Sequence, residues 1–156
     1  MIAKKYVNLI ALGACLVGLS VLGSTKNPVT RPLKGVGHFH CVIHVGYPIG
    51  TGDFKFVATG VGEQTQGGKF HSLLQGYQVP GDPQITGTVT VANGDQLFVK
   101  TELDESTTVT GGTGRFAGAT GHLISPTVGD PVISYDPVTG LMTWDGTQTL
   151  EGTITY

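Results

Sequence analysis

The sequence has few charged residues and no cluster of basic ones. Charged residues make up 13% of its 156 positions, with nine Lys and Arg against eleven Asp and Glu. Proteins that bind nucleic acids hold the phosphates with clustered Lys and Arg, and this chain offers no such cluster. We therefore expect no nucleic-acid partner.

Cysteine is almost absent as well. The chain contains only Cys15 and Cys41. Cys15 lies in a segment that we expect to be removed, so a mature monomer would have no intrachain disulfide. We expect Cys41 to be a small buried apolar residue and not a reactive thiol.

The first 23 residues have the order of a secretory signal peptide. Lys4 and Lys5 precede an uncharged run over 6–23, and small and polar residues follow. This order predicts a signal peptide at 1–23, an N-terminal extension at 24–34 and one domain at 35–156. The mature protein would then be secreted or periplasmic and not membrane-bound. Two alternatives remain: an uncleaved membrane anchor, and a lipoprotein acylated at Cys15, because "LGAC" resembles a lipobox.

Helical periodicity is also missing after Pro32. No stretch repeats apolar residues at helical spacing over three turns, whereas short runs alternate with a period of two between turn residues. The strands predicted on this basis are 36–45, 54–59, 69–77, 84–92, 96–103, 107–110, 119–125, 132–135, 141–144 and 147–155.

Two turns and the final run bear on the architecture. Asn93-Gly94 is typical of a tight hairpin, and Pro137 with Gly140 predicts a second one. An all-β chain of this kind forms a sandwich or a closed barrel. The run at 147–155 is long enough to pair with the first strand and close a barrel, which would remove exposed edges.

One segment resembles a known family. "VTGGTGRFAGATG" at 109–121 is similar to the glycine-rich hairpin of the allene oxide cyclase barrel family, above all of its exported bacterial members. "RPLKG", "GVGEQTQGGKF", "TVANGDQL" and the ending "GTITY" follow the same order. The resemblance covers most of 31–156 and implies a single small antiparallel barrel of eight strands, as in the plant dirigent proteins. It also implies a homo-oligomer, since the plant relatives are often trimers.

The glycine-rich segment is predicted to be structural. Its first glycines can adopt a positive φ at a tight crossing, the aromatic ring can fill the end of the barrel, and the later glycines relieve crowding. Its letters contain part of a nucleotide-binding fingerprint but not the helix that the fingerprint requires, so we expect no cofactor. The residues concerned are Gly111, Gly112, Gly114, Arg115, Phe116, Gly118 and Gly121.

The plant cyclases rearrange an unsaturated fatty-acid epoxide, and their proposed acidic residue lies on the first strand. The corresponding stretch here, "KGVGHFHCVIHV" at 34–45, contains no carboxylate. No residue of the plant active site is matched by motif, so no catalytic residue is assigned.

The same stretch holds three histidines on one face. His38, His40 and His44 alternate with Phe39 and Cys41, so the imidazoles point to water if the apolar face points inward. Two other hypotheses remain. His38 and His40 could bind a metal with a third ligand such as His71, His122 or a carboxylate, or one histidine could donate a proton in a polar pocket.

Glu63 is the remaining candidate for a binding or proton-donating residue. It follows "GVG" and could face the mouth of a barrel or lie in a solvated loop.

These observations favour a non-catalytic protein or a module that binds a small apolar ligand, because an eight-stranded barrel can hold one such molecule. The first alternative is an isomerase or cyclase that acts on a lipid-like or phenolic intermediate. The second is a metal-binding protein that uses His38 and His40. A carboxylate or histidine in an open cavity would favour the enzyme.

Overall fold

The computed structural model describes residues 27–45, 54–79, 82–102 and 104–156. The predicted signal peptide with Cys15, residues 24–26 of the predicted extension and residues 46–53, 80–81 and 103 lie outside the described residues. Within them, no helix is long and apolar enough to cross a membrane. The described part is almost entirely β, with nine strands and one short 3₁₀ turn. The strands are β1 (Thr30–Val45), β2 (Phe54–Gln64), β3 (Gly68–Val79), β4 (Asp82–Val91), β5 (Gln96–Thr101), β6 (Ser106–Gly112), β7 (Thr120–Ile124), β8 (Thr127–Asp136) and β9 (Leu141–Thr155), and the turn is η1 (Gly114–Phe116).

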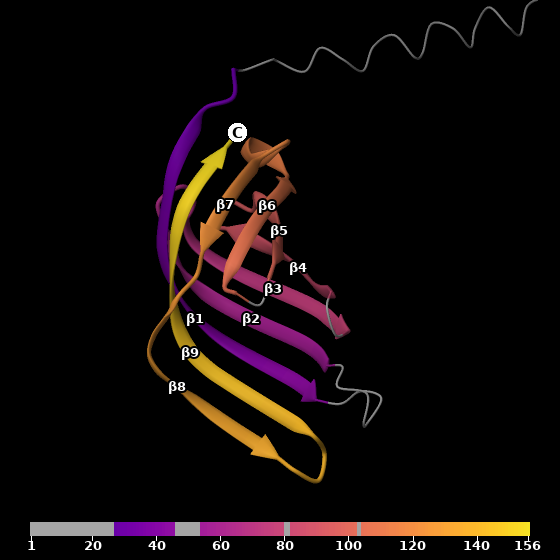
Figure 1. The fold of residues 1–156 in the computed structure, drawn as a ribbon. Helices are drawn as coiled ribbons and strands as arrows, with labels where there is room; N and C mark the ends of the chain where they lie inside the picture. Colours follow the sequence, from indigo (N-terminus) through magenta and orange to yellow (C-terminus); the bar gives the residue numbers. More distant parts are fainter. Residues whose placement is uncertain (1–26, 46–53, 80–81, 103) are drawn as a thin grey trace, which may run out of the picture.

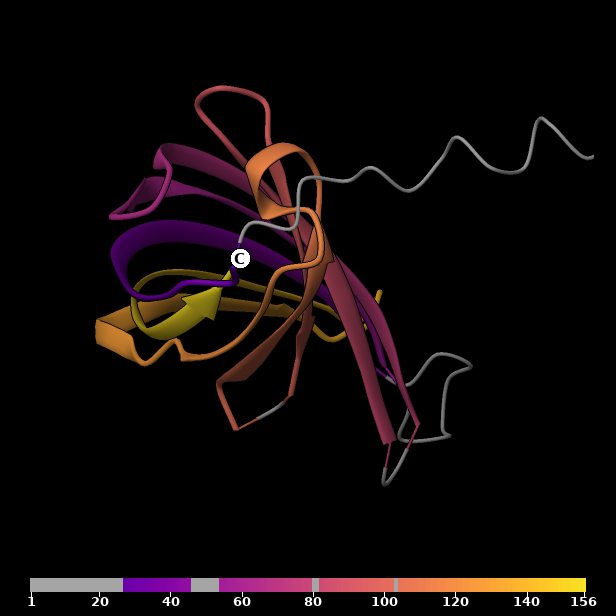
Figure 2. The same ribbon diagram turned by 90° about the horizontal axis from the view of Figure 1, so that it is seen from above.

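The strands form an antiparallel barrel that the first and last strands close (Figure 1). Neighbouring strands run β1 to β7 in chain order, β7 pairs with the end of β9, and β9 pairs with β1 from Thr30↔Thr155 to His44↔Leu141. The predicted closure is therefore confirmed, and the barrel replaces the sandwich alternative. The eighth strand in sequence, β8, lies outside the ring and pairs only with the first half of β9. Figure 2, seen from above, shows the ring and the β8–β9 hairpin beside it.

Alternation along β1 explains how the core forms. Leu33, Phe39 and Cys41 are buried, whereas Lys34, Val36, His38 and His40 on the other face are exposed. Inward residues of the other strands complete one apolar core inside the barrel, as expected for a sheet with one face in water. The core residues are Leu33, Phe39, Phe70, Val91, Leu97, Val99, Val109, Phe116, Ala119, Leu123 and Ile154.

Four strand predictions had wrong bounds. β2 extends to Gln64 and β8 begins at Thr127, beyond the predicted ranges 54–59 and 132–135. The other two differences have a structural cause. The ranges 141–144 and 147–155 form one strand, β9, because Asp145 and Gly146 continue the pairing with β1. A Cβ atom on Gly146 would lie 2.7 Å from the ring of Trp144, so the glycine here makes room for an aromatic side chain and does not end the strand. The first strand begins at Thr30 and not at residue 36, inside the predicted extension, because Leu33 packs in the core.

Both predicted hairpins are confirmed. Between β4 and β5, Gly94 has φ +89°, and Asn93 Oδ1 accepts a hydrogen bond from the amide of Asp95 at 3.1 Å. Between β8 and β9, Gly140 has φ +68°, and Asp136 Oδ1 accepts one from the amide of Val138 at 2.8 Å. Turns with these conformations set the register of the strands on either side.

The glycine-rich segment carries the chain from β6 to β7 across one end of the barrel (Figure 2). Gly114 and Gly118 have φ of +57° and +74°, which few other residues adopt. Phe116, in η1 between them, is fully buried and meets the ring of Tyr156 edge to face, with centroids 5.0 Å apart. The guanidinium of Arg115 lies over the ring of Phe116, 4.8 Å from its centroid, and its Nε is 3.6 Å from Oδ2 of Asp95. These contacts join the segment to the C-terminal Tyr156 and to Asp95 before β5, and the structural role of the segment stays a prediction.

Candidate functional site

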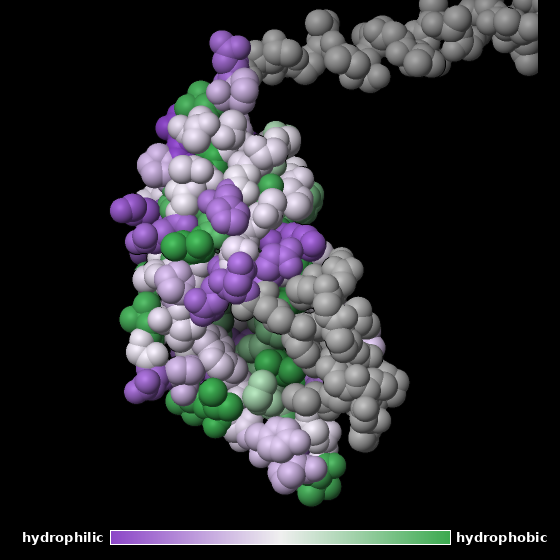
Figure 3. Space-filling view, in the orientation of Figure 1, coloured by the Kyte–Doolittle hydropathy of each residue, from purple (hydrophilic) through white to green (hydrophobic). Residues whose placement is uncertain are grey.

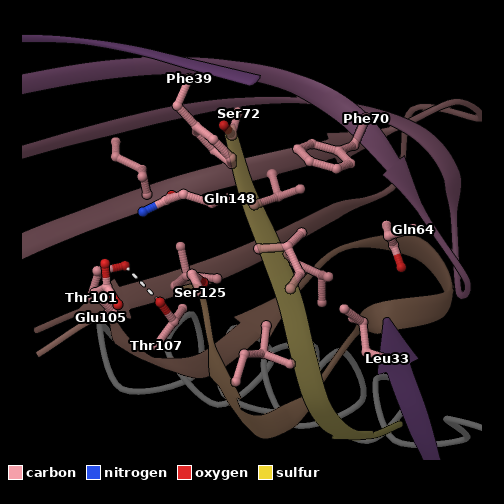
Figure 4. Close-up of a pocket in the computed structure, with 16 residues that line it drawn as sticks. Leu33, Phe39, Gln64, Phe70, Ser72, Thr101, Glu105, Thr107, Ser125 and Gln148 are labelled. Atoms are coloured by element: carbon pink, nitrogen blue, oxygen red, sulfur yellow. Dashed lines mark hydrogen bonds between the residues drawn. The ribbon is translucent and has the colours of Figure 1, made fainter. Parts of the chain in front are cut away.

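A cavity of about 90 Å³, partly open to solvent, lies inside the barrel. Its wall is mostly apolar and comes from all eight strands of the ring, β1 to β7 and β9 (Figure 4). In the view of Figure 3, hydrophobic residues lie within a hollow in the surface. The lining residues are Leu33, Phe39, Gln64, Phe70, Ser72, Leu74, Val89, Leu97, Val99, Thr101, Glu105, Thr107, Leu123, Ser125, Gln148 and Leu150.

Polar groups gather at one end of this cavity. Figure 4 shows Thr101, Glu105, Thr107 and Ser125 close together there. The hydroxyls of Thr101 and Thr107 are 3.1 Å apart and hydrogen-bonded, and Thr127 donates to Glu105 Oε1 at 3.2 Å. Glu105 is exposed, so this end is the polar rim of the cavity.

The backbone at Glu105 is unusual. Its φ of +67° is the one left-handed value among the described residues other than glycine. The amide of Ser125 donates to the carbonyl of Glu105 at 3.0 Å, which ties the turn to the strand end after β7. Non-glycine residues in the left-handed backbone conformation cost free energy, and they cluster at functional sites. The rim therefore holds its carboxylate in a fixed but strained turn.

Deeper in the cavity, two buried polar side chains each carry an atom without a partner. Ser72 on β3 is 5% exposed and Gln64 at the end of β2 is 7% exposed. Neither Ser72 Oγ nor Gln64 Nε2 has a hydrogen-bond partner among the residues that the structure describes. A buried polar group left unpaired typically costs about 1–3 kcal/mol, so these two atoms are the chemically distinctive points of the wall.

The sequence-predicted candidates lie elsewhere. His38, His40 and His44 are all exposed on the outer face of β1, and Glu63 is exposed on the outer face of β2, opposite Lys69 in the pairing with β3. None of the four lines the cavity. Their roles in binding or proton transfer stay predictions.

His40 has a specific partner on the outer surface. Its Nδ1 lies 2.7 Å from Oδ1 of Asp145, its neighbour on β9. The two side chains are 49% and 37% exposed, so the pair contributes about 1 kcal/mol at most. It strengthens the contact between the first and last strands without forming a pocket.

No group of three His, Cys, Asp or Glu side chains gathers for a metal within the part of the chain that the structure describes. The third ligand that His38 and His40 would need is not brought to them there. Cys41, on the inner face of the same strand, is buried as predicted. Burial, and secondarily the charge of Asp145, raises the pKa of its thiol to about 12, which keeps it protonated.

Sequence reasoning missed the polar residues of the cavity. The available signal was the alternation in "KFHSLLQ", where Phe70, Ser72 and Leu74 share one face. Leu73 weakened this signal, because it is apolar and yet 45% exposed on the other face. Glu105 belongs to the charged run "ELDE" at 102–105, and its position at the rim depends on how β6 pairs with its neighbours.

Neither a protein-family model nor a curated protein matches this chain. Among solved structures, the chain is similar to the pterocarpan synthase dirigent protein GePTS1. The identity is 16%, the match covers 85% of this chain and 87% of the other, and the TM-score is 0.47.

Proposed function

We propose that this protein binds one small, largely apolar molecule inside its barrel and does so without needing a cofactor. The observation that carries the proposal is the cavity, which is lined by aliphatic and aromatic side chains and opens at a polar rim. Small-molecule sites usually have this composition, with an apolar wall and a few placed polar groups. A barrel that served only as a structural unit would gain stability by filling this volume.

The size of the cavity restricts the ligand. Its volume of about 90 Å³ is smaller than the roughly 150 Å³ of an engineered cavity that admits benzene. The enclosed part therefore accepts a slim molecule, or one end of a longer molecule whose remainder extends past the rim. Bulky fused-ring compounds are excluded unless the wall moves.

A titration followed by ¹H–¹⁵N NMR tests this function. The probe is 2-methyl-1-pentene, a slim hydrocarbon, and the expected result is saturable shifts of amides on the cavity wall. The variant V89F places an aromatic ring at a lining position and should abolish these shifts. The matched control, V61F, alters a side chain that is 62% exposed on the barrel exterior and should leave them unchanged. Shifts that persist in V89F would refute binding in the lumen.

One observation favours a second candidate, an isomerase. The carboxylate of Glu105 is among the lining groups, and a carboxylate at an apolar cavity can move a proton on a bound molecule. The test is exchange of the α-protons of 2-pentanone in D₂O, followed by NMR. If the protein is an isomerase of this type, the wild type accelerates exchange and E105Q does not. Equal rates in both would eliminate this candidate.

A further inference from the structure

The hydroxyl of Ser72 has no hydrogen-bond partner in the described part of the chain. Ser72 lies on β3 opposite Gly60 of β2 and Val89 of β4, so its direct neighbours in the sheet offer no polar side chain. A Cβ atom on Gly60 would lie 2.7 Å from Ser72 Oγ and would also overlap the ring of Phe39. Glycine at position 60 thus leaves room for both groups.

The surroundings of this hydroxyl are apolar. Figure 4 shows Ser72 beside Phe39, with Phe70 farther along the same wall. The two rings are tilted by 39° with centroids 6.5 Å apart, and Leu74 follows on the same face of β3. In such surroundings a hydrogen bond to a ligand is stronger than in water, because the local dielectric constant is low.

The second unpaired atom, Gln64 Nε2, can only donate. The other end of its amide, Oε1, already accepts a hydrogen bond from the amide of Gln66 at 2.9 Å, which fixes the orientation of the side chain. Ser72 Oγ–H can also donate. Both free positions of the wall can therefore be satisfied by acceptor oxygens.

The charges of the lining residues restrict the class of ligand further. The residues that line the cavity include no Lys, Arg or His, and their only carboxylate, Glu105, is at the rim. An anionic group would enter without a counter-ion, next to an apolar wall, at a high desolvation cost.

From these features we infer that the ligand is a slim, uncharged molecule whose carbonyl or hydroxyl oxygen is hydrogen-bonded by Ser72 inside the barrel. This inference rests on the proposed function and specifies its ligand class. Gln64 Nε2 supplies a second donor for a ligand that carries two oxygens. Discrimination of this kind is strong, because a ligand without the oxygen leaves the buried hydroxyl unpaired.

Water is the competing occupant. A volume of about 90 Å³ corresponds to roughly three molecules at the liquid's share of about 30 Å³ each. Bound water could satisfy Ser72 and Gln64 without any ligand. A test must therefore separate an oxygen-bearing ligand from an apolar one of the same shape.

The experiment compares 2-pentanone with 2-methyl-1-pentene, which has CH₂ in place of the carbonyl oxygen. Dissociation constants are measured by NMR titration for the wild type, S72A and S72C. S134A, which removes a hydroxyl from an exposed residue of β8, is the matched control. The second variant, S72C, keeps the size of the side chain with a weaker donor, and covers the case in which S72A does not fold.

If Ser72 binds the oxygen, S72A raises the dissociation constant of the ketone by about five- to tenfold, as expected for the loss of one hydrogen bond. The dissociation constant of the hydrocarbon should stay unchanged or fall. For S72C the dissociation constant of the ketone should lie between the values for the wild type and S72A, and for S134A it should equal the wild-type value. If both probes bind and S72A affects neither differentially, the inference is refuted, while the proposed binding function stands. If neither probe shifts the cavity residues, the binding function fails, and the inference fails with it.

Discussion

The aromatic ring at the crossing between β6 and β7 provides the most direct test of how this barrel is held together. Phe116 is fully buried in the core, whereas Phe98 on β5 is 39% exposed on the barrel exterior. The two positions allow the same Phe→Ala deletion to be made inside and outside the barrel. The comparison isolates burial, because side-chain chemistry is identical.

The magnitudes follow from the surroundings of each ring. Removing a buried Phe from a core costs about 3–5 kcal/mol, since paired strands around the site can collapse only partly. The edge-to-face contact with Tyr156, at 74° between ring planes, accounts for about 1 kcal/mol of this loss. We expect F116A to lower the free energy of unfolding by about 4 kcal/mol and F98A by about 1 kcal/mol. The loss in F98A is smaller because the partly exposed ring of Phe98 buries less apolar area.

Urea unfolding followed by circular dichroism measures both values. With a slope of about 1.5 kcal/mol per molar urea, F116A should lower the unfolding midpoint by about 2–3 M and F98A by less than 1 M. F116L, which keeps most of the volume, should recover more than half of the loss. If F116A and F98A have equal midpoints, the crossing does not contribute to the core and the structural interpretation of the glycine-rich segment is wrong.

Three further predictions concern single positions. Burial raises the pKa of Cys41 to about 12, so iodoacetamide at pH 8 should alkylate Cys41 only after unfolding, and mass spectrometry locates the modified residue. The stability linked to this thiol should fall as the pH rises from about 9 towards 12. Rapid alkylation of the native protein would contradict this prediction. G114A should destabilise the protein more than G118A in parallel urea melts, because both positions have positive φ but only at Gly114 would the new methyl group collide, with Asp95; equal effects would count against that packing. Hydrogen bonds from the turn lower the pKa of Asp136, so its contribution to stability is present above about pH 3.8 and is lost as the pH falls through the lower pKa of the folded state. D136N should therefore reduce the loss of unfolding free energy at acidic pH. An unchanged loss would show that the turn is not formed.

The sequence predicted those features that local chemistry determines. Asn93-Gly94 and Gly140 mark turns because few other residues adopt their conformations, and the alternation of Phe39 and Cys41 with histidines indicates which face of β1 points inward. Closure by the last strand followed from its length. These predictions rest on residues close together in the chain.

The cavity could not be predicted in the same way, because it depends on register between strands. That Ser72 stands opposite Gly60, and that Glu105 reaches the rim next to Ser125, are consequences of long-range pairing. The sequence interpretation gave most weight to histidines, which are exposed, and little to a serine among apolar residues. The continuous β9 was missed for a related reason, since Gly146 is required by Trp144 and not by a turn.

The strand β7 has a consequence for how molecules could reach the interior. It is the shortest strand in the ring, with only Thr120–Ile124 to link β6 to β9, whereas β1 and β9 are paired over fifteen positions. Fluctuations that break few hydrogen bonds occur most often, so this stretch should exchange its amide hydrogens with solvent sooner than β1 does. Transient separation of β7 from a neighbouring strand, beside the lining residue Leu123, would admit a ligand to the cavity without unfolding the rest of the molecule.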